Sequence, residues 1–121
     1  MGQYDSERTR VTQISREGRD GPARPGEACI IVIYGPELGK RLQLGTAAFE
    51  IGRSARCDLP IDQESVSRHH ARITFDGKEY WIQDLGSTNG TFVNSEQIKQ
   101  AVRLGKGDLL QIGSTVFQVS R

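Results

Sequence analysis

Residues 49–94 read FEIGRSARCDLPIDQESVSRHHARITFDGKEYWIQDLGSTNGTFVN, and polar clusters interrupt the apolar runs of this stretch at three points. The clusters are Gly52-Arg53, residues 67–70 and residues 87–91, and each lies at the end of a strand-like run. Polar residues at strand ends predict a site built from loops. Serine, threonine, asparagine and arginine supply many donors, with few acids to oppose them. We therefore expect this site to bind an anion, and a phosphate in particular.

Short apolar runs separated by turn signals continue outward from this stretch, from residue 28 to the end of the chain. Such spacing, about 8 to 12 residues per run, predicts an all-β sandwich or barrel. Residues 28–34 form a continuous apolar run typical of a buried strand, and residues 71–75 alternate apolar with polar. Asp76-Gly77 predicts a two-residue type I′ hairpin turn, and Trp81 on the return strand is expected in the core.

The composition limits the classes of protein to which the chain can belong. Its 121 residues suffice for one domain, and sixteen Lys plus Arg against fifteen Asp plus Glu leave a net charge of +1. No global field would therefore draw it to nucleic acid or to a membrane. The sequence has neither an apolar run of roughly 20 residues nor a signal peptide, so we expect a cytoplasmic protein. Cys29 and Cys57 are expected as small core residues, because they are too few for a disulfide framework.

Residues 1–27 differ in character from the rest of the chain. They hold five arginines and five acids with scattered Gly and Pro, and they have too few apolar residues to form a core. The sequence therefore predicts two parts, a disordered regulatory tail over residues 1–27 and a β domain over residues 28–121. Thr9 and Thr12 stand beside arginines in the tail and are candidate phosphorylation sites.

Three motifs in order give the β domain a resemblance to the forkhead-associated (FHA) family. These motifs are Gly52-Arg53, Ser67 with His70 three residues later, and Thr88-Asn89-Gly90. The match extends over roughly residues 28–120. The resemblance implies a two-sheet β-sandwich of about eleven short strands whose loops bind phosphothreonine peptides. One departure is Ser95, where the family often has glycine, and this substitution puts the local turn in question rather than the site.

The resemblance also implies a role for each candidate residue. Arg53 is expected as the cation that holds the phosphate, because a guanidinium can bond two phosphate oxygens at once. Ser67 and Thr88 are expected as hydroxyl donors, and Asn89 as a partner of the ligand's main chain. The full set expected to bind phosphothreonine is Arg53, Ser67, Arg68, Thr88 and Asn89. The residues expected to support the site structurally are Gly52, His70, Gly90 and Asn94.

Other classes of function are less consistent with the sequence. Ser67 and His70 suggest nucleophilic catalysis, but no third orienting acid or oxyanion motif accompanies them, so no catalytic residue is expected. Adjacent histidines on a strand point to opposite faces, so His69 and His70 are not expected to share a metal, and no cofactor is implied. A β-barrel that binds single-stranded nucleic acid remains the alternative, although it would need surface aromatics interleaved with basic residues.

The sequence therefore predicts a non-catalytic phosphothreonine-binding module of bacterial-type Ser/Thr kinase signalling. Its expected partners are a kinase and a phosphothreonine-containing protein, or its own tail phosphorylated at Thr9 or Thr12. No nucleic-acid or membrane partner is expected, and the chain is expected to be part of a longer signalling protein. The resemblance places Glu64 and Ser65 near the third ligand residue after the phosphothreonine, where they should disfavour acidic side chains.

Overall fold

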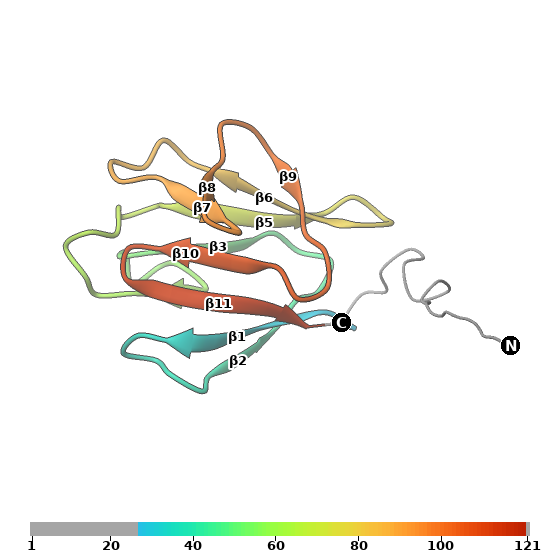
Figure 1. The fold of residues 1–121 in the computed structure, drawn as a ribbon, viewed down its shortest axis with the longest axis horizontal. Helices are drawn as coiled ribbons and strands as arrows, with labels where there is room; N and C mark the ends of the chain where they lie inside the picture. Colours follow the sequence, from blue (N-terminus) through green and yellow to red (C-terminus); the bar gives the residue numbers. More distant parts are fainter. Residues whose placement is uncertain (1–26, 121) are drawn as a thin grey trace, which may run out of the picture.

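The computed structural model describes residues 27–120, which form eleven β-strands in two sheets (Figure 1). The first sheet has the order β2 (Arg41–Gln43), β1 (Cys29–Tyr34), β11 (Thr115–Ser120), β10 (Leu109–Ile112), β7 (Thr91–Val93) and β8 (Glu96–Gln97). The second has the order β4 (Leu59–Pro60), β3 (Phe49–Gly52), β5 (Ala71–Phe75), β6 (Tyr80–Asp84) and β9 (Val102–Arg103). This all-β sandwich confirms the predicted fold class. The tail and its threonines, Thr9 and Thr12, lie outside the described residues.

The core lies between the two sheets and takes side chains from both. Ile30, Leu110 and Phe117 of the first sheet and Ile73 and Ile82 of the second are each at most 1% exposed. Burial of one such side chain contributes about 1.5–3 kcal/mol, so this layer is the main source of stability. Both free cysteines are buried, as predicted. No helix that could cross a membrane is found in the described part of the chain.

The strand directions bring the polar clusters to one end of the sandwich. Strands β3 and β6 end there, and β5 and β7 begin there, so the connections 53–58, 61–70 and 85–90 gather at the left of Figure 1. At the opposite end, Cys29 at the start of β1 pairs with Ser120 at the end of β11. The sheets therefore serve as a rigid base for a cluster of three loops.

The β5–β6 hairpin is present, but its turn differs from the prediction. The turn is centred on Gly77 and Lys78, because the Asp76 amide donates to the Glu79 carbonyl oxygen at 3.0 Å. Gly77 is the one residue of this turn with positive φ, at 99°, whereas a type I′ turn requires two. The Asp76 carboxylate accepts the amides of Lys78 and Glu79, which fixes Asp76 before the turn. Trp81 is half-buried outside the core cluster and donates to the same carboxylate, so its predicted core position was wrong.

The two-residue type I′ geometry occurs instead in the β7–β8 hairpin. Val93 pairs with Glu96, and the two residues between them, Asn94 and Ser95, have φ values of 51° and 74°. Asparagine tolerates this conformation better than serine does. Ser95 therefore occupies a left-handed position that favours glycine. Serine at this position, where the family often has glycine, makes the turn a strained one.

This strain predicts that Ser95→Gly raises the free energy of unfolding by about 1 kcal/mol, because glycine adopts positive φ without a Cβ clash. Urea denaturation followed by the fluorescence of the single tryptophan would measure the change. Ala47→Gly is a suitable control, since Ala47 is exposed and is not among the residues with positive φ. It should lower stability slightly through chain entropy. Equal destabilisation by both substitutions would contradict the prediction.

Candidate functional site

The loop cluster begins where the chain leaves β3 at Gly52. A Cβ atom on Gly52 would lie 2.3 Å from the Arg68 carbonyl oxygen and 3.0 Å from Cys57 Sγ. Only glycine therefore lets the segment around Arg68 cross so close to the end of β3. The crossing is fixed by the Arg53 amide, which donates to the Ser67 carbonyl oxygen at 2.9 Å, and by the Ser54 amide, which donates to that of Arg68 at 3.1 Å.

Ser67 joins the first loop to the third. Its carbonyl oxygen accepts the Arg53 amide, and its Oγ accepts the Thr88 amide at 3.0 Å. Because Oγ acts as the acceptor in that bond, its own proton remains available to a ligand. The side chains of Arg53 and Thr88 are exposed. The structure thus joins Arg53, Ser67 and Thr88 from three separate loops, and these are three of the residues expected from the sequence.

Asn89 joins the third loop to the second. Its Nδ2 donates to the Ser65 carbonyl oxygen at 3.0 Å, while the residue itself remains exposed. The amide oxygen and the second N–H hydrogen are left for a ligand main chain. Gly90 follows with a φ of 90°, and a Cβ there would lie 2.7 Å from Gln97 Nε2. Glycine is therefore required at the point where this loop turns into β7.

His70 lies beneath the three loops and is completely buried. Its Nδ1 accepts the Ser67 amide at 3.0 Å, so its Nε2 carries the hydrogen that is donated to the Gly90 carbonyl oxygen at 2.8 Å. One neutral imidazole thus holds the second loop to the third. Because both ring nitrogens are bonded to main-chain atoms, neither is free to activate the Ser67 hydroxyl, and the pair lacks the geometry of a catalytic nucleophile and base.

The structure places Asn94 away from the loop cluster. It lies at the far end of β7, where its Oδ1 accepts the Leu109 amide at 3.0 Å and its Nδ2 donates to Asp108 Oδ1 at 3.1 Å. These bonds tie the β7–β8 turn to the start of β10. The side chain of Asn94 therefore supports the hairpin, and it makes no hydrogen bond to the loops of the site within residues 27–120.

Asp84, at the end of β6, organises the third loop more than its sequence position suggested. One carboxylate oxygen accepts the amides of Gly86 and Ser87 at 2.9 Å, and the other accepts the hydroxyls of Ser87 and Thr91. Burial raises the pKa of Asp84, but these hydrogen bonds, led by the Ser87 hydroxyl, outweigh it and hold the pKa below its ordinary value. The contact of Asp84 with Thr91, seven residues later in the chain, is visible only in the structure.

A carboxyl whose pKa is lower in the folded state stabilises the fold above its unfolded pKa, and this contribution is lost as the pH falls through the folded pKa. Asp84→Asn should therefore lower the free energy of unfolding by about 2–3 kcal/mol at neutral pH. The NH₂ group of asparagine replaces one carboxylate oxygen, and the two hydrogen bonds that this oxygen accepts are lost. The difference from the wild type should shrink below about pH 4. Denaturant titrations between pH 7 and pH 3 would show this. Asp62→Asn, at an exposed loop position, is the control, and a pH-independent difference for Asp84→Asn would refute the assignment.

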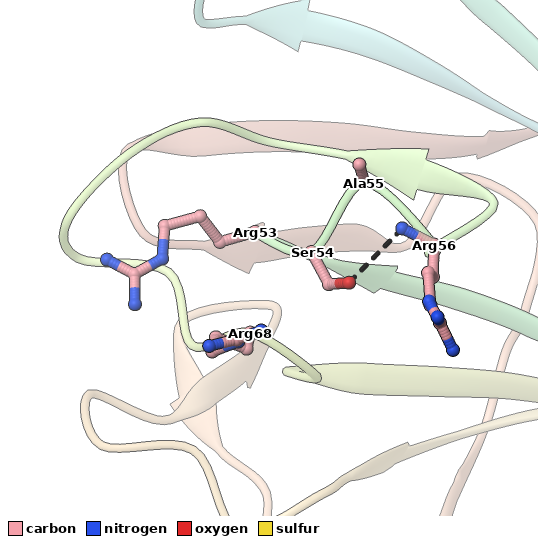
Figure 2. Close-up of a pocket in the computed structure, with 5 residues that line it drawn as sticks. All are labelled: Arg53, Ser54, Ala55, Arg56 and Arg68. Carbon is pink, nitrogen blue, oxygen red and sulfur yellow. Dashed lines mark hydrogen bonds between the residues drawn. The ribbon is translucent and has the colours of Figure 1, made fainter.

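Arg68 lines a surface hollow of about 480 Å³ together with Arg53, Ser54, Ala55 and Arg56 (Figure 2). Arg53 and Arg68 reach the hollow from different loops. Arg56 was not singled out from the sequence, where it is one of several arginines in a polar stretch. The loop that contains Arg56 is closed by the Arg56 amide, which donates to Ser54 Oγ at 3.1 Å.

One group of potential metal ligands lies beside this hollow. Glu50, Cys57 and His69 each place a ligand atom within 4.8 Å of the other two. Hydrogen bonds from Arg72 and then from His69 lower the pKa of Glu50, so both of its oxygens are already engaged. Burial raises the pKa of the Cys57 thiol, which donates to the Arg68 carbonyl oxygen. Each of these groups already has a hydrogen-bond partner in the protein, so they give no argument for a metal site.

The family model of the FHA domain matches residues 49–113, the span that contains all three loops. The chain belongs to the FHA domain family. The FHA resemblance noted in the sequence is thereby confirmed. Among its relatives, the glycogen accumulation regulator GarA of Mycobacterium tuberculosis is 36% identical over 113 residues, which are 93% of this chain and 68% of GarA. An oxoglutarate dehydrogenase inhibitor of Corynebacterium jeikeium is 40% identical over 73% of this chain and 60% of its own length.

Solved FHA domains have the same fold. Mycobacterium tuberculosis EmbR, solved in complex with a low-affinity phosphopeptide, is 39% identical with a TM-score of 0.72, over 77% of this chain and 24% of EmbR. An FHA domain studied for its phosphothreonine-dependent interactions is 31% identical with a TM-score of 0.71, over 78% of this chain and 95% of that domain. The two curated relatives are named as a regulator and an inhibitor.

Proposed function

We propose that this FHA domain is a non-catalytic module that binds phosphothreonine-containing proteins in bacterial-type Ser/Thr kinase signalling. The observation that carries the proposal is the pair of bonds that Ser67 makes to the amides of Arg53 and Thr88, since they hold one cation and two hydroxyl donors together. A phosphothreonine offers about −1.5 to −2 charge and three strong acceptor oxygens. The loops supply the complementary groups, and the relatives include an FHA protein solved with a phosphopeptide.

Each residue of the cluster has a role in this proposal. Arg53 bonds two phosphate oxygens, Ser67 and Thr88 donate their hydroxyls to the phosphate, and Arg68 adds a second positive charge. Asn89 bonds the main chain of the peptide. Gly52, His70 and Gly90 hold the loops in place, because glycine permits the two close approaches and the imidazole bridges two loops.

The test is calorimetry with matched peptides that carry phosphothreonine, phosphoserine or unmodified threonine. We expect phosphothreonine to bind and threonine not to bind. The γ-methyl group contributes only about 0.8 kcal/mol by transfer, so a strong preference over phosphoserine requires a pocket that fits this methyl. Equal affinity for all three peptides would refute the proposed function. Equal affinity for the two phosphopeptides would refute only the threonine preference.

We further propose that one partner is the chain's own tail, phosphorylated at Thr9 or Thr12. Fifteen residues separate Thr12 from Ala28, a length that spans about 20 Å as a flexible chain and about 50 Å when extended. The six-residue strands β1 and β11 are about 20 Å long, so the tail can travel from the start of β1 to the loops. A tether of this length gives an effective concentration of roughly millimolar, which would keep a micromolar site about 99.9% occupied.

Self-binding would make phosphorylation of the tail a switch that excludes other phosphoproteins, or a signal to a downstream domain of a longer protein. When a Ser/Thr kinase phosphorylates the tail, the amide resonances of Arg53, Ser67 and Thr88 should shift. Alanine at the threonine that binds the site, by Thr9→Ala or by Thr12→Ala, should abolish the shift. Dilution distinguishes binding within one chain from binding between two. If the amide resonances do not shift after complete phosphorylation, self-binding is refuted, whereas the proposal that the domain binds phosphopeptides stands. A cytoplasmic location belongs to the proposal, because kinases draw phosphate from cytoplasmic ATP.

A further inference from the structure

The hollow beside the proposed phosphate site is surrounded by three arginines. Figure 2 shows Arg53 and Arg56 on opposite sides of Ser54, with their guanidinium groups directed away from each other. Arg68, from the neighbouring loop, lies between them. The Arg56 backbone is held by the 3.1 Å bond from its amide to Ser54 Oγ, and the Ser54 amide is in turn bonded to the Arg68 carbonyl oxygen. The bases of these three side chains are therefore fixed relative to one another.

None of the three guanidinium groups has an ion pair or a hydrogen bond to another residue in the part of the chain that the structure describes. Arg72 and Arg103, by contrast, are paired with Glu50 and Glu79. The nearby carboxylates are engaged elsewhere, because Asp58 accepts the Glu50 amide at 2.8 Å and Glu50 is bonded to Arg72 and His69. Three like charges around one hollow repel one another, so the arrangement favours a bound anion.

One phosphate cannot use all three charges. The proposed phosphothreonine site is centred on Arg53, Ser67 and Thr88, and Arg56 points away from Arg53 on the far side of Ser54. A single phosphate bonded in bidentate fashion by Arg53 would leave Arg56 without an anion. The exposed guanidinium of Arg56 is therefore available to a second acidic group of the ligand.

We propose that the ligand carries, a few residues from its phosphothreonine, a second anionic side chain that binds at Arg56, with Arg68 between the two anions. This proposal rests on the proposed function and names its substrate class as a peptide with two anionic groups on one side. The second group is a carboxylate or a phosphate, since either satisfies a guanidinium. The part of the site near Asn89 differs, because the exposed Glu64 directly precedes Ser65, whose carbonyl oxygen accepts a hydrogen bond from Asn89. Acidic ligand residues should gain affinity toward Arg56 and lose it toward Glu64.

The experiment is a scan in which glutamate or a second phosphothreonine is placed at each of three positions on either side of one phosphothreonine in an otherwise neutral peptide. Affinities are measured for the wild type, for Arg56→Gln and for Arg103→Gln, a control from the opposite end of the sandwich. We expect about a threefold gain for glutamate and about a tenfold gain for phosphothreonine at the favourable positions. Arg56→Gln should remove these gains and change affinity for the neutral peptide by less than about twofold.

If no position gains affinity, or if the gains persist in Arg56→Gln while the neutral peptide binds normally, the second subsite is refuted and the proposed function stands. If the wild type binds no phosphothreonine peptide, the proposed function fails and the second subsite fails with it. The two scans distinguish the sources of the anion, since a carboxylate site would respond to glutamate as strongly as to phosphate. Unchanged thermal melting of Arg56→Gln confirms that the comparison concerns folded protein.

Discussion

Arg53→Ala is expected to weaken binding of a phosphothreonine peptide by about ten- to a hundredfold. The substitution removes a charge-assisted hydrogen bond worth about 1.5–3 kcal/mol, and often a second one from the same guanidinium. The backbone around Arg53 should not move, because the hydrogen bond from the Arg53 amide to the Ser67 carbonyl oxygen does not depend on the side chain. Calorimetry with one phosphopeptide would therefore measure the loss of a side-chain contact rather than a change of fold.

Two further variants sharpen this measurement. Arg53→Lys keeps the charge but not the planar pair of donors, so it should recover little of the lost affinity. Arg103→Ala removes an exposed arginine from β9, where Nη1 lies 3.6 Å from Glu79 Oε1, and it should leave the affinity unchanged. If Arg53→Ala binds as tightly as Arg103→Ala does, Arg53 is not the residue that holds the phosphate.

His70→Ala is expected to lower the free energy of unfolding by about 3–5 kcal/mol and to abolish peptide binding. The substitution leaves the Ser67 amide and the Gly90 carbonyl oxygen without their partner, at about 1–3 kcal/mol each, and it opens a cavity beneath the loops. Because the imidazole bridges the second and third loops, its loss should also separate Ser67 from Thr88.

The neighbouring histidine provides the matched control. His69 has 55% of its side chain exposed and is bonded to Glu50 Oε1 at 3.2 Å, so His69→Ala should cost no more than about 1 kcal/mol. Urea denaturation and peptide titration of both variants would compare two alanines at adjacent positions. Similar losses from the two would contradict the bridging role of His70. Should His70→Ala fail to fold, His70→Gln provides a milder test, since one amide can replace part of the bridge.

The fold could be predicted from local signals, because alternation of apolar residues and the glycine-containing turns determine short strands. The details that failed depend on competition between neighbours. Asp76-Gly77 is a strong signal for a type I′ turn, but the Asp76 carboxylate accepts the amides of Lys78 and Glu79, and the turn is shifted by one residue. Asn94-Ser95 is a weak signal, yet it forms that turn because β7 and β8 must pair across two residues.

The candidate site could be predicted for a different reason. Gly52, Ser67 and Thr88 recur in motifs whose order is specific, so residues far apart in the sequence could be placed together before the structure was known. The position of Arg56 could not, because the direction of an exposed side chain depends on a loop closed by Ser54 and on the segment that crosses at Arg68. The reach of Asp84 to Thr91 was hidden for the same reason, since the loop between them brings the two together.

The pairing of Cys29 with Ser120 has a consequence for the connection of this domain to other chain segments. Both points of attachment lie on neighbouring strands at one pole of the sandwich, and the loops lie at the other pole (Figure 1). A short covalent link between the two points would give a circular chain with its sheets unchanged. The exposed connection at residues 46–48 could then be opened, giving a permuted protein whose new ends leave the loop pole free.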